Sequence, residues 1–285
     1  MLRKGDLTQG GITGTLLHFT LPMLVGSFLQ QCYNIADTLI VGQCIGAGAL
    51  AAVGSAYTLM VFLISVLLGL AMGSGTVFSL HYGAGNHVAL RRSIFSSFVL
   101  IGIVTLILNV AVFIWLDPIL RLLQVPQDIY GMMRSYLWII FCGIVFTFIY
   151  NFYASLLRAV GDSVTPLWFL AVSVVLNIAL DLFFILQLDW GIQGAAAATV
   201  LAQGVAALGI IIYTYRRRPE LRWHHEDMCF DRTCLKEIAS FSTLTCIQQS
   251  VMNLGILMVQ GLVNSFGTAV MAAFAAAVKI DLSLI

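Results

Sequence analysis

Two aspartates stand in segments of the sequence that are otherwise strongly apolar. The run "VVLNIALDLFFIL" at residues 174–186 holds Asn177 and Asp181 one helical turn apart, and "QQCYNIADTLIVG" at residues 30–42 holds Asp37. A carboxylate at mid-bilayer costs at least about 2.5–3.5 kcal/mol, so such groups are rare, face inward and mark functional sites. The chemistry that fits them is the binding of a proton or of a hard monovalent cation.

The composition places these aspartates in a membrane protein. The chain has 285 residues, of which 60% are hydrophobic and only 9% are charged, and its mean hydropathy is +0.97. A soluble domain carries about 25% charged residues. The net charge of +1 gives no sign of a nucleic-acid partner, and the six cysteines include no CxxC pair, so no disulfide framework is expected. The polar N-terminus lacks the design of a cleavable signal peptide.

Eight apolar runs predict an all-α integral membrane fold. A spanning helix needs about 20 apolar residues. Seven runs reach that length and the eighth continues to the last residue: roughly 16–42, 50–80, 94–116, 135–157, 167–188, 194–215, 240–263, and 268 to the end.

The distribution of lysine and arginine predicts the orientation. With a cytoplasmic N-terminus, eleven of these residues fall in the inner segments and two, Arg121 and Arg134, in the outer ones. This positive-inside bias places the N-terminus and the loop 216–239 in the cytoplasm. That loop contains His224, His225, Cys229 and Cys234, but their spacing fits no tetrahedral zinc template, so we interpret it as a basic linker.

A repeat divides the chain into two unequal parts. A shift of 219 residues aligns "QQCYNIADTLIVG" with "QSVMNLGILMVQG", including Gln30 with Gln249 and Asn34 with Asn253. An even number of spans separates the copies, so the repeat is parallel. We therefore expect a six-helix N-terminal lobe at 1–215, a cytoplasmic linker at 216–239 and the start of a C-terminal lobe at 240–285. The sequence would then be a truncated product, or else a natural short form.

Depth along the helices predicts which polar residues meet. Asp37 lies nine residues before the outer end of its span and Asp181 nine before the end of its own, about 13 Å in each case. Thr199 lies six residues into the next span, about 9 Å from the same side. With Asn177 they would form an oxygen-rich site, in which protonation or cation binding removes the repulsion between two acids. The alternative is that each aspartate only fixes helix packing.

Three other features have competing interpretations. Pro22 interrupts the first span and is either a hinge or a static kink. Gly69 and Gly73 predict close helix packing without chemistry. A further polar and aromatic set could line a cavity, although core or interfacial positions explain it as well: Tyr33, Asn34, Tyr150, Asn151 and Tyr153.

The sequence resembles the multidrug and toxic compound extrusion (MATE) family. The resembling stretches are "LPMLVGSFLQQCYNIADTLIVGQ", "LRAVGDSVTP", "VVLNIALDLFFI" and "GIQGAAAATVLAQ". The resemblance implies two six-helix lobes around a central cavity, and drug export in exchange for protons or sodium. It implies that Asp37, Asn177, Asp181 and Thr199 match the ion site of the N-terminal lobe, with H+ or Na+ as the ion, and that Pro22 matches a bending proline. The seventh span has no acid, which sets the chain apart from members that carry a cation-binding Glu there.

We therefore expect an antiporter rather than an enzyme. It would export a small organic, cationic substrate through a bacterial inner membrane that it crosses several times, without a cofactor. One alternative is a flippase for lipid-linked precursors, which would need cations in its cavity, whereas the first lobe offers no buried Arg or Lys. Another is an inert fragment.

An intramembrane enzyme is a further alternative that the sequence does not favour. Prenyl transfer needs clustered acids such as DDxxD, and none is present. Proteolysis by a Ser–His pair would need a buried histidine, but all five lie near the predicted cytoplasmic side: His18, His81, His87, His224 and His225.

Overall fold

The regular structure of the chain is helical throughout residues 12–222 and 232–281, the parts that this computed structural model describes. His224, His225 and Cys229 of the predicted linker, with the first eleven residues, lie outside them. The described elements are α1 (Ile12–Cys44), α2 (Ala47–Gly83), α3 (His87–Leu122), α4 (Gln127–Cys142), α5 (Ile144–Ala159), α6 (Val164–Leu182), the π-helical turn η1 (Phe183–Gln187), α7 (Gly191–Arg217), the 3₁₀ turn η2 (Pro219–Leu221), α8 (Arg232–Asn264) and α9 (Thr268–Asp281).

Five of the described helices are long and apolar enough to cross a membrane: α2, α3, α6 with η1, α7 and α8. The bent pair α4 and α5 makes a sixth span if it is counted as one. Two predicted spans are not among these. They are α1, whose middle carries Gln30, Gln31, Asn34 and Asp37, and α9, of which 14 residues are described.

The fourth span is not the single straight helix expected over 135–157. It bends by 49° between α4 and α5 at Gly143. A β-carbon at Gly143 would collide with the side chain of Val200, so the glycine lets the bend approach α7. Across the same contact, the hydroxyl of Thr147 donates a hydrogen bond to the amide oxygen of Gln203.

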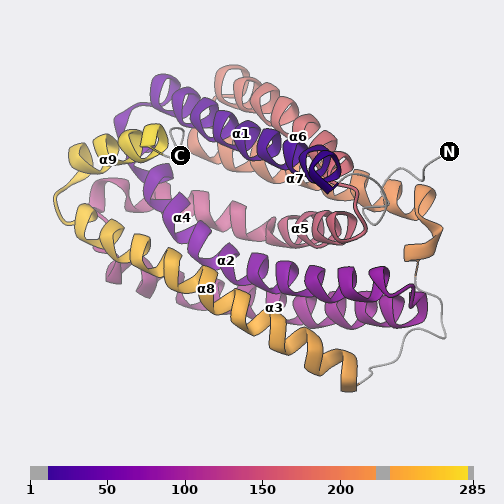
Figure 1. Cartoon of the computed structure of the whole chain (residues 1–285). Coiled ribbons are helices and arrows are strands. Elements are labelled where there is room, and N and C mark those ends of the chain that lie inside the picture. Colours follow the sequence, from indigo (N-terminus) through magenta and orange to yellow (C-terminus); the bar gives the residue numbers. More distant parts are fainter. Residues whose placement is uncertain (1–11, 223–231, 282–285) are drawn as a thin grey trace.

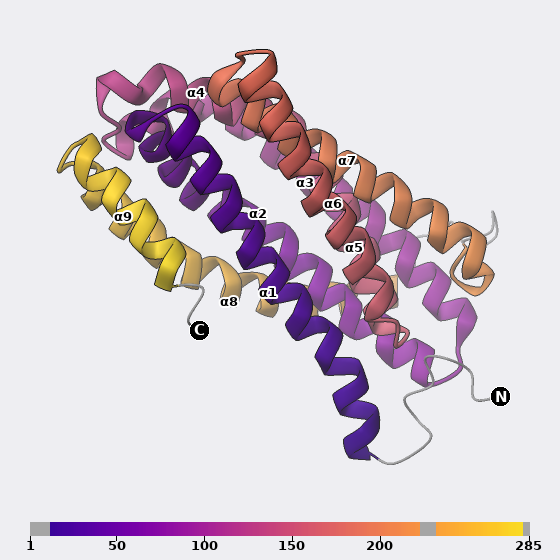
Figure 2. The same ribbon diagram turned by 90° about the horizontal axis from the view of Figure 1, so that it is seen from above.

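α2 and α7 form the centre of the bundle and the other helices surround them (Figures 1 and 2). Half of the most apolar stretch of α2 and of α7 is buried, against 22% for α3 and 17% for α8. The largest buried side chains include Phe78, Phe141 and Phe152. Large apolar side chains such as Leu106, Ile114 and Trp168 are exposed on the outer helices, as expected of a surface that faces lipid.

α8 packs along α2, and two glycines allow the close approach (Figure 1). β-Carbons at Gly69 and Gly73 would run into the backbone of Cys246 and Ser242 respectively. The close packing expected of this small-residue pair is therefore present. At the other end of the same interface, Gln260 donates to Ser55 Oγ at 2.8 Å, and Asn264 donates to the carbonyl of Leu123 at 2.8 Å.

The repeated segments form elements of equal length. α1 and α8 each have 33 residues, and each leads through a short turn with a positive-φ glycine, Gly46 or Gly267, into a further helix. The division into two lobes remains a prediction.

Candidate ion-coupling site

Three helices meet at the polar residues that the sequence singles out. α1 carries Asp37, α6 carries Asn177 and Asp181, and α7 carries Thr199. α6 packs against both α1 and α7, and α1 also contacts α7. The π-helical turn η1 begins two residues after Asp181. Such turns interrupt the regular hydrogen-bond ladder and are frequent at functional sites.

The two carboxyl groups face each other across the α1–α6 contact. The side chains of Asp37 and Asp181 are within hydrogen-bonding distance. Asn177 satisfies its neighbours with its amide nitrogen toward Asp181. In that orientation it donates to Asp181 Oδ2 at 2.8 Å and accepts from the backbone N–H of Thr199 at 3.1 Å. The structure therefore brings all four predicted site residues together, while their role in ion coupling remains a prediction.

The site is closed to solvent on the α6 and α7 side. Asp181 is 0% exposed, Asn177 1% and Thr199 6%, while Asp37 is partly buried. Oδ1 of Asp181 accepts no hydrogen bond from an N–H or hydroxyl group of the described residues. A buried carboxylate oxygen without a donor carries a desolvation cost. A proton shared with Asp37, or a small cation, would remove that cost.

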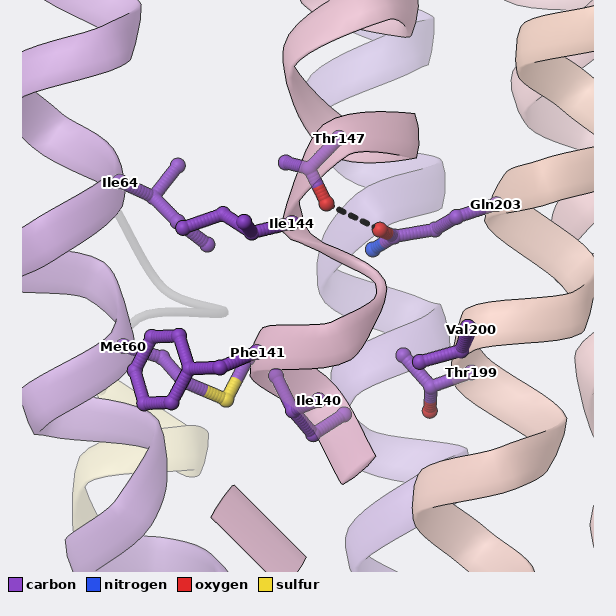
Figure 3. A pocket seen from close by; sticks show the side chains of 9 residues that line it. All are labelled: Met60, Ile64, Ile140, Phe141, Ile144, Thr147, Thr199, Val200 and Gln203. Carbon is purple, nitrogen blue, oxygen red and sulfur yellow. Dashed lines mark hydrogen bonds between the residues drawn. The ribbon is translucent and has the colours of Figure 1, made fainter. Parts of the chain in front are cut away.

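Tyr33 connects α1 to the same site rather than lining an open cavity. Its hydroxyl lies 3.5 Å from Thr199 Oγ1, and Thr199 in turn donates to the carbonyl of Ala195 at 3.1 Å. Figure 3 shows Thr199 and Val200 one turn along α7 from the hydrogen bond between Thr147 and Gln203. The cavity between these side chains measures about 10 Å³. That is close to the lower limit for one water molecule.

A larger cleft lies beside the carboxyl pair. It has a volume of about 450 Å³ and is lined by α1, α5, α6 and a residue of α2. Of the residues predicted to line a cavity, Asn34, Tyr150 and Asn151 do so, and Pro22 lies on the same wall. Tyr153 instead packs in the aromatic core, with its ring centroid 5.6 Å from that of Phe152.

Arg158 also lines this cleft and is half-buried there. The expectation that the first lobe offers no buried Arg or Lys is therefore wrong for this residue. Arg158 closes the last turn of α5, where its side chain can reach inward beneath α1 and α6. Placement at a helix end near the cytoplasmic side indicated an exposed charge, and only the packing of α1 against α6 turns it into a wall of the cleft.

Two further polar residues of the site were not singled out from the sequence. Tyr57 lines the cleft and forms a side-chain hydrogen bond with Asn34. Gln203 lies four residues after Thr199, so its position on the same face of α7 could have been read from the helical period. Nothing in the local sequence marks Tyr57, because its role depends on how α2 meets α1.

Comparison with known proteins places the chain among membrane transporters. The MatE family matches residues 22–183, more than half of the chain. The probable multidrug resistance protein YpnP of Bacillus subtilis is 32% identical over 287 residues, which cover 98% of this chain and 62% of that protein. The multidrug export protein MepA of Staphylococcus saprophyticus is 31% identical over 210 residues, which cover 71% of this chain and 45% of that protein. The chain thus spans less than two thirds of the length of these relatives.

Solved structures share the fold. The MATE multidrug transporter DinF-BH, solved in complex with a rhodamine, superposes with a TM-score of 0.90 at 25% identity, covering 99% of this chain and 63% of that one. An inward-facing MATE family transporter of the MOP superfamily gives a TM-score of 0.81 at 25% identity, covering 93% and 61%. These likenesses confirm the all-α membrane fold and the resemblance to this family.

Proposed function

This chain belongs to the MATE family, and we propose that the protein exports small organic compounds across the bacterial inner membrane in exchange for protons. The relatives named above are multidrug export and resistance proteins, which supports a small organic substrate. The proposal concerns the protein at full length. No cofactor and no chemical conversion of the substrate are required, because the ion gradient drives the exchange.

The observation that carries the proposal is the buried carboxyl pair. Two carboxyl groups can hydrogen-bond to each other only when at least one holds a proton. Asp37 and Asp181 are within that distance. Among the described residues, no lysine or arginine forms an ion pair with Asp181. The pair is therefore suited to take up a proton and to lose it as a unit.

The orientation of Asn177 favours a proton over Na+ as the coupling ion. Its amide nitrogen, a donor, points at Asp181. A sodium ion would need the amide oxygen to face the carboxylates, since hard cations are bound through oxygen. In the present arrangement that oxygen instead accepts from the backbone of Thr199.

Loss of the proton would change how α1 sits against α6. Two unit charges 4 Å apart repel by about 4 kcal/mol at an effective dielectric constant of 20. That repulsion acts directly between the two helices that carry Asp37 and Asp181. The neutral pair holds α1 against α6, and the charged pair pushes them apart.

Pro22 lets this movement reach the substrate cleft. It stands fifteen residues before Asp37 in the same helix and lines the cleft. Proline removes one hydrogen bond of the helix ladder, so bending is easier there than elsewhere in α1. The hydroxyl of Ser163 donates to the carbonyl of Phe19 at 2.9 Å, which ties the segment before Pro22 to the α5–α6 turn. Protonation from outside would thus reshape the wall of the cleft and release substrate.

A flippase for lipid-linked precursors is the second candidate, and Arg158 is the observation that favours it. A diphosphate headgroup would find this guanidinium in the cleft. Against it, no other lysine or arginine of the described chain lines the cleft, whereas a diphosphate carries at least two negative charges. The carboxyl pair would also have no role in a flippase that needs no ion gradient.

The test is dye transport by the full-length protein in liposomes, with either a pH gradient or a sodium gradient imposed. We expect transport of a rhodamine ethyl ester with the pH gradient, and loss of it in Asp181→Asn. Asp189→Asn is the matched control, because Asp189 is an exposed aspartate in the turn that follows the same span. Transport driven equally well in Asp181→Asn, or only by sodium, would refute proton exchange at this pair.

A further inference from the structure

We infer that the compound held in the cleft between α1, α5 and α6 carries a carboxylate or another oxyanion, which Arg158 binds, on an otherwise apolar body. This inference rests on the proposed export function and assigns the chemistry of its substrate. It differs from the cationic substrate expected from the sequence.

The charge of the cleft carries the first step. Arg158 is the one charged side chain among the described residues that line it, and no aspartate or glutamate does so. The carboxyl pair lies outside this lining, beyond Asn34 and Tyr57, which are hydrogen-bonded to each other. An organic cation entering the cleft would meet a guanidinium and no carboxylate, so the cleft disfavours it.

The hydrogen bonds of Arg158 carry the second step. A guanidinium has five N–H donors. In this structure Nη2 donates to Ser155 Oγ at 3.2 Å, and none of the ion pairs between described residues includes Arg158. Asp162, the nearest acid along the chain, is bound instead by Arg218 at 3.4 Å and by the backbone and hydroxyl of Thr165. Arg158 therefore keeps donors for a ligand.

The other polar groups around the cleft have their protons committed to the protein. Tyr150 donates its hydroxyl to the carbonyl of Pro166 at 3.0 Å, Ser163 donates to Phe19, and Asn151 donates to the carbonyl of Thr147 at 2.8 Å. Arg158 is consequently the strongest donor left for an acceptor in the cleft. Its planar fork matches a carboxylate in two parallel hydrogen bonds.

The opposite wall fits an apolar body. Met23 of α1 and Leu167 and Leu170 of α6 line the cleft, close to where Gly26 lets α1 approach α6. A volume of about 450 Å³ is in the range of sites for drug-sized molecules. An amphiphile with one anionic end is therefore complementary to both walls.

The test compares two dyes that differ only at the predicted contact. One is a rhodamine ethyl ester, and the other is its free acid, which has a carboxylate on the same ring system. Binding of each to the full-length protein in nonionic detergent would be followed by fluorescence anisotropy. We expect Arg158→Gln to weaken binding of the acid about tenfold or more, the loss of a charged hydrogen-bonded pair, and to leave binding of the ester unchanged.

Two variants make the result specific. Arg158→Lys keeps the charge without the fork and should weaken binding of the acid less than Arg158→Gln does. Arg217→Gln removes an exposed arginine at the cytoplasmic end of α7 and should change neither dye. If the acid binds wild-type protein no better than the ester, or if Arg158→Gln weakens both dyes equally, the inference is overturned. Proton-driven export could still stand in that case.

A lipid phosphate could supply the same oxyanion, and a second arm separates the sources. Phosphatidylglycerol would be titrated against the bound acid dye. Displacement in wild-type protein identifies a lipid headgroup as a ligand of Arg158, and no displacement identifies a soluble compound with a carboxylate. Either result supports an oxyanion at Arg158.

Discussion

At the scale of single residues, Thr199 joins the three helices of the carboxyl site. Its hydroxyl lies 3.5 Å from that of Tyr33 on α1, and its backbone N–H lies 3.1 Å from the amide oxygen of Asn177 on α6. The first contact depends on the side chain and the second does not. A substitution at Thr199 can therefore separate the link to α1 from the orientation of Asn177.

We predict that Thr199→Val slows proton-driven dye export, while Thr199→Ser exports at close to the wild-type rate. Valine has nearly the shape of threonine but leaves the Tyr33 hydroxyl without its partner, a loss of about 1 kcal/mol or roughly fivefold. Initial rates in liposomes at equal protein content measure this. Equal rates for valine and serine would show that the hydroxyl has no part in coupling.

Depth predicted which residues meet, but not which way they face. The helical rise of about 1.5 Å per residue placed Asp37, Asp181 and Thr199 at one level, because depth needs only a count along the chain. Orientation depends on the rotation of each helix against its neighbours. For this reason Tyr33 was expected in a cavity but lies against Thr199, and Arg158 was expected in solvent but lines the cleft.

At the scale of elements, the interface of α2 with α8 combines two kinds of contact. Gly69 and Gly73 allow backbones to touch at one end. At the other end Gln260 and Asn264 of α8, both buried, bond to Ser55 and to each other. Such an interface is held by close packing and by polar groups that have no partner in lipid.

We predict that Gly69→Val destabilises the protein in detergent by about 1–3 kcal/mol, because the side chain would push α8 away from α2. Gly131→Ala is the control: Gly131 is an exposed helical glycine with no neighbouring atom within 4 Å of an added β-carbon. It should be neutral or stabilising by up to about 1 kcal/mol. Unfolding midpoints measure both, and an unchanged midpoint for Gly69→Val would contradict the close contact.

We predict that Pro22→Ala lowers the turnover of export without weakening substrate binding. Alanine restores the missing helix hydrogen bond and stiffens α1, but the cleft keeps its polar groups. Export rates and dye affinity would be measured on the same preparation. Wild-type turnover would show that the proline is a static kink.

Local sequence signals explain which elements were foreseen. Apolar runs with glycine-containing turns between them predicted the helices, including the turn at Gly161. The break at Gly143 was missed because "FCGIVF" has a single glycine and no proline within an apolar run. The bend is set by the contact of Gly143 with Val200, which is fifty-seven residues away and leaves no local mark.

At the scale of the whole molecule, the proposed mechanism needs the carboxyl pair nearer the outer surface and the cleft open toward the cytoplasm. The excess of lysine and arginine in alternate segments predicts that orientation. Cys44, at the end of α1, is an exposed cysteine that would then lie outside.

A membrane-impermeant maleimide should therefore label Cys44 in intact cells when it is the protein's single cysteine. A variant with Arg217→Cys as the single cysteine should be labelled only after the cells are opened, because Arg217 ends α7 on the opposite side. The reverse pattern would invert the topology and the direction of exchange.

The most direct test of proton exchange is the release of protons when substrate binds. Substrate would be added to the full-length protein in weakly buffered detergent solution, and the pH would be followed. The account predicts release of about one proton per bound substrate from wild-type protein, because the pair gives up its shared proton as a unit. Asp37→Asn and Asp181→Asn should bind substrate without release, and Asp189→Asn should behave as wild type. Substrate binding without proton release in the wild type, or undiminished release in both site variants, would contradict it.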